Sequence, residues 1–231
     1  MWESMSLPES HRYIEAFSDS RLSHHFNSVQ ATFYQRTGKR ILDVSCAIAG
    51  LVLLAPFFLV VAVLLKLTSS RSVLFRQPRV GQKGRIFLLV KFRSMCGSGE
   101  SSPLITVASD PRITFVGAIL RKFKIDELPQ LWNVLKGEMS LVGPRPEVER
   151  YVAGYTRQQR RVFEVRPGIT DPAAIAYRHE EKLLAAHSNP EGFYRTIVLP
   201  HKLSLNLEYV ENISFRRDML LLLKTFRSII P

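Results

Sequence analysis

The chain has 231 residues, 46% of them hydrophobic, which is enough for a core and for one large domain or a domain with attachments. Its formal net charge of +12 indicates an anionic partner: nucleic acid, an anionic membrane surface or a phosphorylated substrate. Two cysteines, and six histidines without metal-ligand spacing, argue against a disulfide framework and a zinc site and favour a reducing, cytosolic environment for the soluble part.

The first segments in chain order are a polar extension and a long apolar run. Residues 1–35 lack the apolar core and cleavage site of a secretory signal, so we expect a loosely ordered or surface-lying extension. Residues 44–65 carry no charge and are long enough to form a membrane helix. Pro56 near the middle would kink or break that helix, and basic residues flank both ends, which favours the cytoplasmic side for both.

Each half of the apolar run covers under roughly 20 Å and cannot cross a hydrocarbon core of roughly 30 Å. We therefore expect a helix that enters the membrane, bends at Ala55-Pro56 and returns to the same side. A kinked spanning helix and a buried core helix are the alternatives.

The composition becomes globular after Lys66. Residues 72–75 and 86–92 are rich in Val, Ile and Phe, and a segment with Pro and Gly lies between them, which predicts two short strands joined by a basic turn. Residues 97–111 contain Gly, Ser and Pro and are expected to form a loop. Residues 113–123 are predicted to be helical.

Asp126 and Glu127 stand where the next helix is expected to begin. Pro129 fits only the first turn of such a helix, and four apolar residues have the spacing of one buried face: Leu128, Leu131, Trp132 and Leu135. The N-terminus of a helix favours negative charge and also attracts phosphate. Two adjacent carboxylates among basic residues can hold a divalent metal, or one can attack an electrophile; the alternative is an ordinary helix cap.

The C-terminal third contains arginines beside prolines and further helices. Two prolines flank Arg145 and fix how its guanidinium is presented, unless this is only a rigid turn. Residues 147–163 are predicted to form one helix, and residues 180–210 are predicted to be helical with a break near Asn189-Pro190. Residues 213–230 form a basic amphipathic pattern suited to a membrane interface, with an amphipathic core helix as the alternative.

Several short motifs between residues 37 and 231 follow one another at specific intervals. They are Lys39-Arg40 before the proline-broken run, FRQ at 75–77, RVG at 79–81, KFRSM at 91–95, DELPQ at 126–130, NVLKG at 133–137, Met139-Ser140, VGPRP at 142–146 and RPGIT at 166–170. Each motif is weak alone, but in this order the set resembles the monotopic phosphoglycosyl transferases, the bacterial sugar transferase family.

The resemblance implies an α+β fold: a mostly helical cytosolic catalytic domain with a short β-hairpin, anchored by a Pro-broken re-entrant membrane helix and interfacial amphipathic helices. The implied boundaries are an N-terminal extension over 1–36, the re-entrant helix over 37–68 and the catalytic domain over 69–231. The implied location is the cytoplasmic face of the bacterial inner membrane.

The resemblance also implies transfer of a sugar 1-phosphate from a UDP-sugar to polyprenol (undecaprenyl) phosphate in polysaccharide or glycoconjugate synthesis. Asp126 would be the nucleophile, carrying a covalent phosphosugar after UMP leaves, and Asp126 and Glu127 would hold Mg²⁺. Phosphate or nucleotide would be bound by Lys91, Arg121, Arg145 and Arg178. Membrane lipids are the other expected partners, and no nucleic acid is expected.

Two departures from the family pattern concern the membrane helix and the substrate. Many members have Ser-Pro where this chain has Ala55-Pro56, which affects the detailed bend. The common pattern Gly-Trp-Ala-Gln-Val-Asn-Gly-Arg keeps its arginine here as Arg178, but most other residues of 171–178 differ, so the sugar is not identified. The alternative functions are a non-catalytic basic membrane-associated binding protein and a glycosyltransferase that releases UDP.

Overall fold

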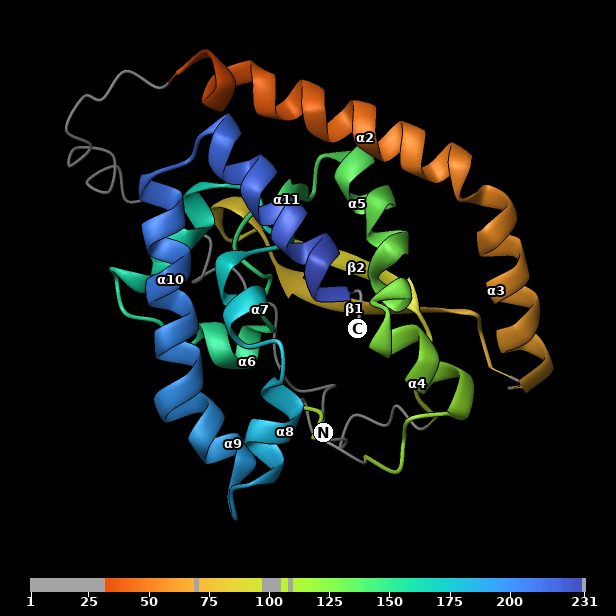
Figure 1. Ribbon diagram of the computed structural model, residues 1–231. Coiled ribbons are helices and arrows are strands. Elements are labelled where there is room, and N and C mark those ends of the chain that lie inside the picture. Colours follow the sequence, from red (N-terminus) through yellow and green to blue (C-terminus); the bar gives the residue numbers. More distant parts are fainter. Residues whose placement is uncertain (1–31, 69–70, 97–104, 108–109, 230–231) are drawn as a thin grey trace, which may run out of the picture.

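The computed structural model describes residues 32–229 apart from 69–70, 97–104 and 108–109 (Figure 1). Most of the expected N-terminal extension, and most of the loop expected over 97–111, lie outside the described residues. The described chain is mostly helical and contains two small sheets, an antiparallel pair β1-β2 and a parallel pair β3-β4. The expectation of a mostly helical α+β fold with a short β-hairpin is therefore confirmed.

The apolar run forms two helices, α2 (Lys39–Leu53) and α3 (Ala55–Thr68), after a π-helical turn at Tyr34–Gly38. Pro56 is the second residue of α3, where its missing N–H breaks no helical hydrogen bond, so the interruption falls at Leu54. In the described part of the chain, no helix taken singly has the length and apolar character needed to cross a bilayer. The segments Tyr34–Leu53 and Ala55–Thr68, bent by 60°, meet that requirement only as a pair.

Both halves of the bent pair pack against the rest of the chain and run along two adjacent edges of it (Figure 1). Ala47 of α2 contacts an apolar cluster that includes Leu131 and Met139, whereas α3 inserts Val61 and Leu65 against the hairpin and the next helix. The opposite faces of both helices expose large apolar side chains, listed in chain order: Ile41, Ile48, Val52, Leu53, Phe57, Leu59, Val60, Val63, Leu64 and Leu67.

The hairpin consists of β1 (Leu74–Val80) and β2 (Ile86–Phe92), joined by a 3₁₀ turn at Gln82–Gly84. The prediction for the second strand is confirmed, but the first strand starts two residues later and ends five residues later than the predicted 72–75, and Pro78 pairs with Leu88 inside it. A two-stranded sheet leaves an unpaired edge on each strand, and proline is tolerated there because its missing N–H is not needed for pairing.

The helix predicted over 113–123 is confirmed as α4 (Phe115–Lys122). Beyond it, the chain forms a 3₁₀ segment, Ile125–Gln130, before α5 (Leu131–Lys136). The predicted buried face is wrong at Trp132, which is 52% exposed, whereas Val134 is fully buried. A 3₁₀ helix advances by 120° per residue and an α-helix by 100°, so the face projected from Leu128 rotates before it reaches α5.

The prediction of a single helix over 147–163 is wrong. The chain forms α6 (Glu149–Val152) and, later, a 3₁₀ segment at Gln159–Glu164. Thr156 and Gln159 exchange side-chain to backbone hydrogen bonds, the arrangement of a capping box that starts a new segment. Buried apolar side chains on both sides of this break then pack into one cluster beneath α10: Tyr151, Val152, Tyr155, Val162 and Phe163.

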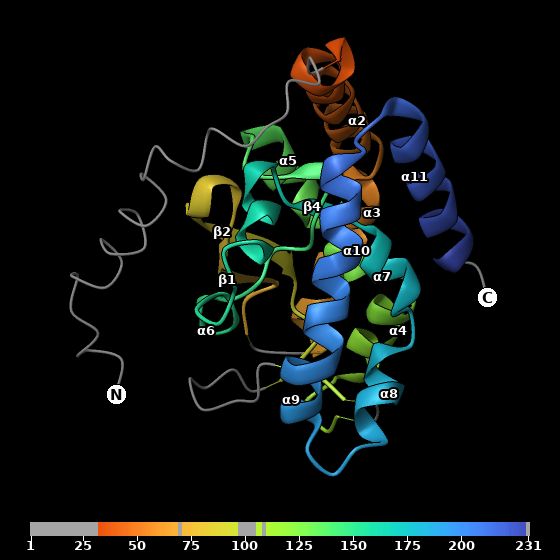
Figure 2. The same ribbon diagram turned by 90° about the vertical axis from the view of Figure 1, so that its left-hand side faces the viewer.

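The remaining elements complete the fold around the two parallel strands, β3 (Ser140–Val142) and β4 (Gly168–Thr170). They are α7 (Pro172–Ala176), α8 (Glu180–Ala185), α9 (Pro190–Phe193), a π-helical turn (Tyr194–Val198), α10 (Leu199–Glu211) and α11 (Phe215–Ile229). The break predicted near Asn189-Pro190 is confirmed, since Asn189 caps α9. Figure 2 shows α10 along the length of the domain, with α11 returning beside it.

Candidate active site

The acidic doublet Asp126-Glu127 lies in the 3₁₀ segment that connects α4 to α5. Lys124, directly before the 3₁₀ segment, adopts a left-handed backbone conformation (φ 56°), which turns the chain out of α4. Asp126 is 5% exposed, so its carboxyl group is almost withdrawn from solvent. A tight local turn therefore places a buried carboxylate directly beside the basic end of α4.

Glu127 forms an ion pair with Arg145, whose Nη2 lies 2.7 Å from Oε1 of the glutamate. Burial raises the pKa of Glu127, but the charges of Arg145 and Lys124 and the hydrogen bond from Arg145 outweigh it and lower that pKa to about 2. The negative charge of Glu127 in turn raises the pKa of Arg145. The pair therefore remains ionised throughout the physiological range.

The pKa of Asp126, unlike that of Glu127, is raised. Burial and the charge of Glu127 raise the pKa of Asp126, and the positive charges of Lys91, Arg121 and Lys124 oppose that rise. Its Oδ1 atom is buried and accepts no hydrogen bond. A carboxylate oxygen with its lone pairs unengaged is available to attack an electrophile or to bind a cation.

Lys91 reaches the doublet from β2. Burial and the charge of Arg79 lower the pKa of Lys91 to about 8, and the negative charges of Asp126 and Glu127 limit the decrease. Arg121 approaches from the last turn of α4, where its guanidinium also forms an ion pair with Glu181 of α8. Two further cations thus come from elements distant in sequence from Arg145.

Five of the six predicted site residues interact electrostatically through the acidic doublet: Lys91 and Arg121 with Asp126, and Arg145 with Glu127. Arg178 follows α7 and is exposed. Its charge is not among the main causes of the pKa shifts of Asp126 and Glu127. The segment that carries it is also the one that departs from the family pattern.

The Pro144-Arg145-Pro146 segment is held by residues to which the sequence alone assigned no role. The guanidinium of Arg79 donates to the carbonyl oxygen of Pro146 at 3.0 Å, and Glu147 receives a hydrogen bond from the hydroxyl of Tyr194 at 2.7 Å. The RVG motif at 79–81 was a signal for Arg79. No local pattern marks Glu147 or Tyr194, which meet only in the folded chain.

The doublet suits a magnesium ion. Mg²⁺ usually binds one or two carboxylates, with waters and substrate phosphates supplying the other ligands. Asp126 and Glu127 provide two carboxylates, and Asp126 Oδ1 lacks a hydrogen-bond partner. Among the described residues there is no group of three or more His, Cys, Asp or Glu side chains that could hold a metal without such phosphates.

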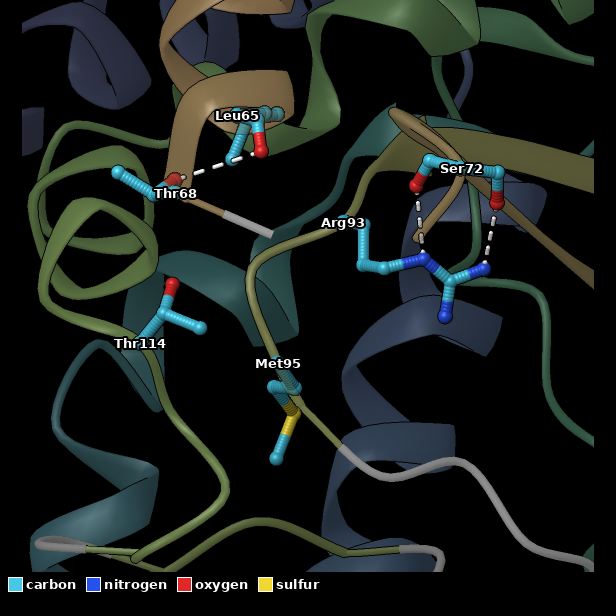
Figure 3. Close-up of a pocket in the computed structure, with 6 residues that line it drawn as sticks. All are labelled: Leu65, Thr68, Ser72, Arg93, Met95 and Thr114. Carbon is cyan, nitrogen blue, oxygen red and sulfur yellow. Dashed lines mark hydrogen bonds between the residues drawn. The ribbon is translucent and has the colours of Figure 1, made fainter. Parts of the chain in front are cut away.

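A separate hollow lies between the end of α3 and the start of α4 (Figure 3). It is lined by Leu65, Thr68, Ser72, Arg93, Met95 and Thr114. Figure 3 shows Arg93 turned toward Ser72, to which it donates two hydrogen bonds of 2.9 Å. Neither carboxylate of the doublet lines this hollow, so it is not the candidate active site.

Comparison with known proteins identifies one family and several named relatives. The bacterial sugar transferase family matches residues 34–231. The UDP-N-acetylgalactosamine-undecaprenyl-phosphate N-acetylgalactosaminephosphotransferase of Aeromonas hydrophila is 38% identical over 198 residues, covering 83% of this chain and 43% of that protein. This chain thus spans less than half of the Aeromonas protein.

Two other relatives are covered more fully. The exopolysaccharide production protein ExoY of Sinorhizobium fredii is 33% identical over 207 residues, covering 83% of this chain and 84% of that protein. The UDP-glucose:undecaprenyl-phosphate glucose-1-phosphate transferase of Caulobacter vibrioides is 36% identical over 198 residues, covering 83% of this chain and 69% of that protein. The names of the Aeromonas and Caulobacter proteins contain different sugars, N-acetylgalactosamine and glucose.

Proposed function

The chain belongs to the bacterial sugar transferase family, and on that premise we propose that it transfers a sugar 1-phosphate from a UDP-sugar to undecaprenyl phosphate. The names of the Aeromonas and Caulobacter relatives support this acceptor and this class of reaction. The name of the ExoY relative supports a place in exopolysaccharide synthesis.

The observation that carries the proposal is the buried, hydrogen-bond-free Oδ1 of Asp126 among positive charges. In the first step, a carboxylate oxygen of Asp126 attacks the phosphorus that bears the sugar. The bond from that phosphorus to the bridging oxygen breaks, UMP leaves with the bridging oxygen, and the phosphosugar remains on Asp126. This is nucleophilic catalysis with a covalent intermediate.

In the second step, a phosphate oxygen of undecaprenyl phosphate attacks the same phosphorus. The bond to Asp126 breaks, the carboxylate is regenerated, and the product is undecaprenyl diphosphate sugar. The scheme predicts ping-pong kinetics because UMP leaves before the acceptor reacts.

The cations of the site have distinct tasks in this scheme. Lys91, Arg121 and Arg145 place positive charge where charge develops on the transferred phosphoryl group and on departing UMP. The Glu127 ion pair keeps Arg145 at the doublet before substrate binds. Arg178 is proposed to bind the nucleotide from its exposed segment after α7.

Asp126 and Glu127 are proposed to hold Mg²⁺ together with the diphosphate of the donor. When bound, the ion offsets the negative charge of the diphosphate, which otherwise repels an anionic nucleophile.

The decisive experiment is product analysis with a panel of UDP-sugars and undecaprenyl phosphate, using the full chain in detergent or native membranes. We expect release of UMP. When the acceptor is omitted, we also expect mass spectrometry to detect a phosphosugar adduct on Asp126. Release of UDP would select a glycosyltransferase that moves the sugar without its phosphate. Salt-sensitive DNA binding with no nucleotide release would select a basic binding protein.

We also propose that the bent pair α2-α3 enters the membrane and returns to the cytoplasmic face of the bacterial inner membrane. Its exposed apolar faces and its 60° bend support this placement. Cysteines engineered at Thr37 and Lys66, with Cys46 and Cys96 replaced by serine, test it. An impermeant thiol reagent should label both positions in inside-out vesicles and neither in right-side-out vesicles. Labelling from opposite sides would show a spanning helix.

A further inference from the structure

The residues directly before Arg145 are held by two backbone hydrogen bonds to β4. The N–H of Gly143 donates to the carbonyl of Thr170, and the N–H of Gly168 donates to the carbonyl of Pro144, each at 3.0 Å. A Cβ atom on Gly168 would lie 2.1 Å from the nitrogen of Gly143, so only glycine permits this approach. The prolines on both sides of Arg145 have no N–H, so the backbone of each proline can be held by a hydrogen bond only through its carbonyl oxygen.

The carbonyl of Pro146 is held by a side chain. Nη1 of Arg79 donates to that oxygen at 3.0 Å and lies 3.4 Å from Oε2 of Glu147, while Nη2 donates to Gln77 at 2.8 Å. The planar fork of a guanidinium makes such simultaneous contacts, which the single ammonium of lysine cannot reproduce. The Val80 N–H also donates to the carbonyl of Glu147 at 2.9 Å, which aligns β1 with this segment.

Arg79 is also connected, through Glu147, to the turn before α10. Its partner Glu147 is buried and accepts a hydrogen bond of 2.7 Å from the hydroxyl of Tyr194, at the π-helical turn before α10. A continuous series of contacts therefore runs from Tyr194 through Glu147 and Arg79 to Pro146, and the adjoining Arg145 contacts Glu127.

We propose that Arg79 is a positioning residue for the transfer reaction: it fixes the backbone at Pro146 so that Arg145 is presented to Glu127 and to the phosphoryl group. Glu147 and Tyr194 support it. This inference rests on the proposed function, but it concerns residues outside the acidic doublet and its direct cationic partners. The alternative is that Arg79 only stabilises the fold.

The test combines Arg79→Lys, Arg145→Lys and the double variant in the full, detergent-solubilised chain, with UMP release as the assay. Because a lysine at this position keeps the charge and loses the fork, we expect kcat to fall about 10- to 100-fold in Arg79→Lys, with KM for the UDP-sugar changing less than about threefold. If Arg79 acts through Arg145, the double variant should be within about twofold of Arg145→Lys alone.

Losses that multiply in the double variant, or a wild-type kcat in Arg79→Lys, would overturn the proposal. Arg161→Lys is the matched control because Arg161 pairs with Glu211 at 2.8 Å away from the doublet, and its kcat should equal that of wild type within about twofold.

A milder variant keeps the test decisive if Arg79→Lys does not fold. Tyr194→Phe removes one hydroxyl from the series and leaves Arg79 in place, so kcat should fall about three- to tenfold, the effect of one lost buried hydrogen bond. An unchanged kcat would count against the proposal. Wild-type protein that releases no UMP overturns the proposed function, whereas an active wild type with equally active Arg79 and Tyr194 variants overturns only this inference.

Discussion

Two buried aspartates in this molecule, Asp126 and Asp218, differ in how completely their oxygens are hydrogen-bonded. Asp218 of α11 is 1% exposed and accepts hydrogen bonds from the hydroxyl groups of Tyr34 and Tyr209 and from the ammonium of Lys39. The hydrogen bonds of Asp218 therefore connect α11 to α10, to the first residue of α2 and to the π-helical turn before α2. Asp126 is nearly as buried, but its Oδ1 has no hydrogen-bond partner.

Asp43 of α2 behaves like Asp218. It is 2% exposed and accepts hydrogen bonds from the Leu141 N–H at 2.9 Å and from the Ser140 hydroxyl at 3.0 Å. Burial of a carboxylate costs free energy unless hydrogen bonds and charges compensate for lost water. The hydrogen bonds of Asp218 and Asp43 connect elements of the fold, whereas Asp126, whose Oδ1 has no hydrogen-bond partner, lies where we propose that bonds are made and broken.

The largest effect should come from Asp126→Asn. Without a nucleophilic carboxylate, UMP release should fall by at least about a thousandfold, the order seen when a catalytic nucleophile is removed. The midpoint of thermal unfolding should stay equal to that of wild type or rise, because an incompletely compensated buried charge is removed. Persistent UMP release at near wild-type rates would remove Asp126 as the nucleophile.

Asp218→Ala should show the reverse pattern. It leaves one ammonium and two phenol groups without their common partner, so the free energy of unfolding should fall by about 3 kcal/mol. The turnover of the fraction that remains folded should match wild type. Asp218→Asn, which keeps an acceptor of the same shape, is the matched control and should lose less stability. A fall in kcat larger than the loss of folded protein would contradict a purely connecting role.

Glu127→Gln should have an intermediate effect that is specific to catalysis. The variant loses the ion pair with Arg145 and one proposed ligand of Mg²⁺, so kcat/KM should fall about 10- to 100-fold. The Mg²⁺ concentration for half-maximal activity should rise, and removal of Mg²⁺ with EDTA should abolish wild-type activity. An unchanged magnesium titration would exclude Glu127 as a ligand. Glu164→Gln, in a partly exposed pair with Arg161, is the control.

The smallest effect should come from Trp132→Ala, at the start of the helix that follows the doublet. Because Trp132 is 52% exposed, its removal should change the free energy of unfolding by less than about 1 kcal/mol. Leu131→Ala, one residue earlier and buried, should cost about 2–4 kcal/mol. Urea unfolding of the two variants measures the difference. A larger loss of stability in Trp132→Ala than in Leu131→Ala would support the buried helix face predicted from apolar spacing.

The sequence alone determined the features that depend on neighbouring residues. The hairpin, the interruption beside Pro56, the break at Asn189-Pro190 and the place of the acidic doublet after a basic helix end all follow from local patterns. Proline and glycine restrict or release the backbone wherever they occur, so their effects can be predicted without the rest of the chain. The motifs and their order likewise identified the family before any contact was known.

Only the tertiary structure decided which charges are compensated and which helix faces are buried. Tyr34 and Asp218 are separated by 184 positions, and Glu147 and Tyr194 by 47, so no local pattern relates them. The face of α5 depends on the 3₁₀ segment before it, and the segment 147–163 divides where side chains cap a new turn. The environment of a buried carboxylate is the sum of all groups packed around it, and packing joins residues without regard to their distance along the chain.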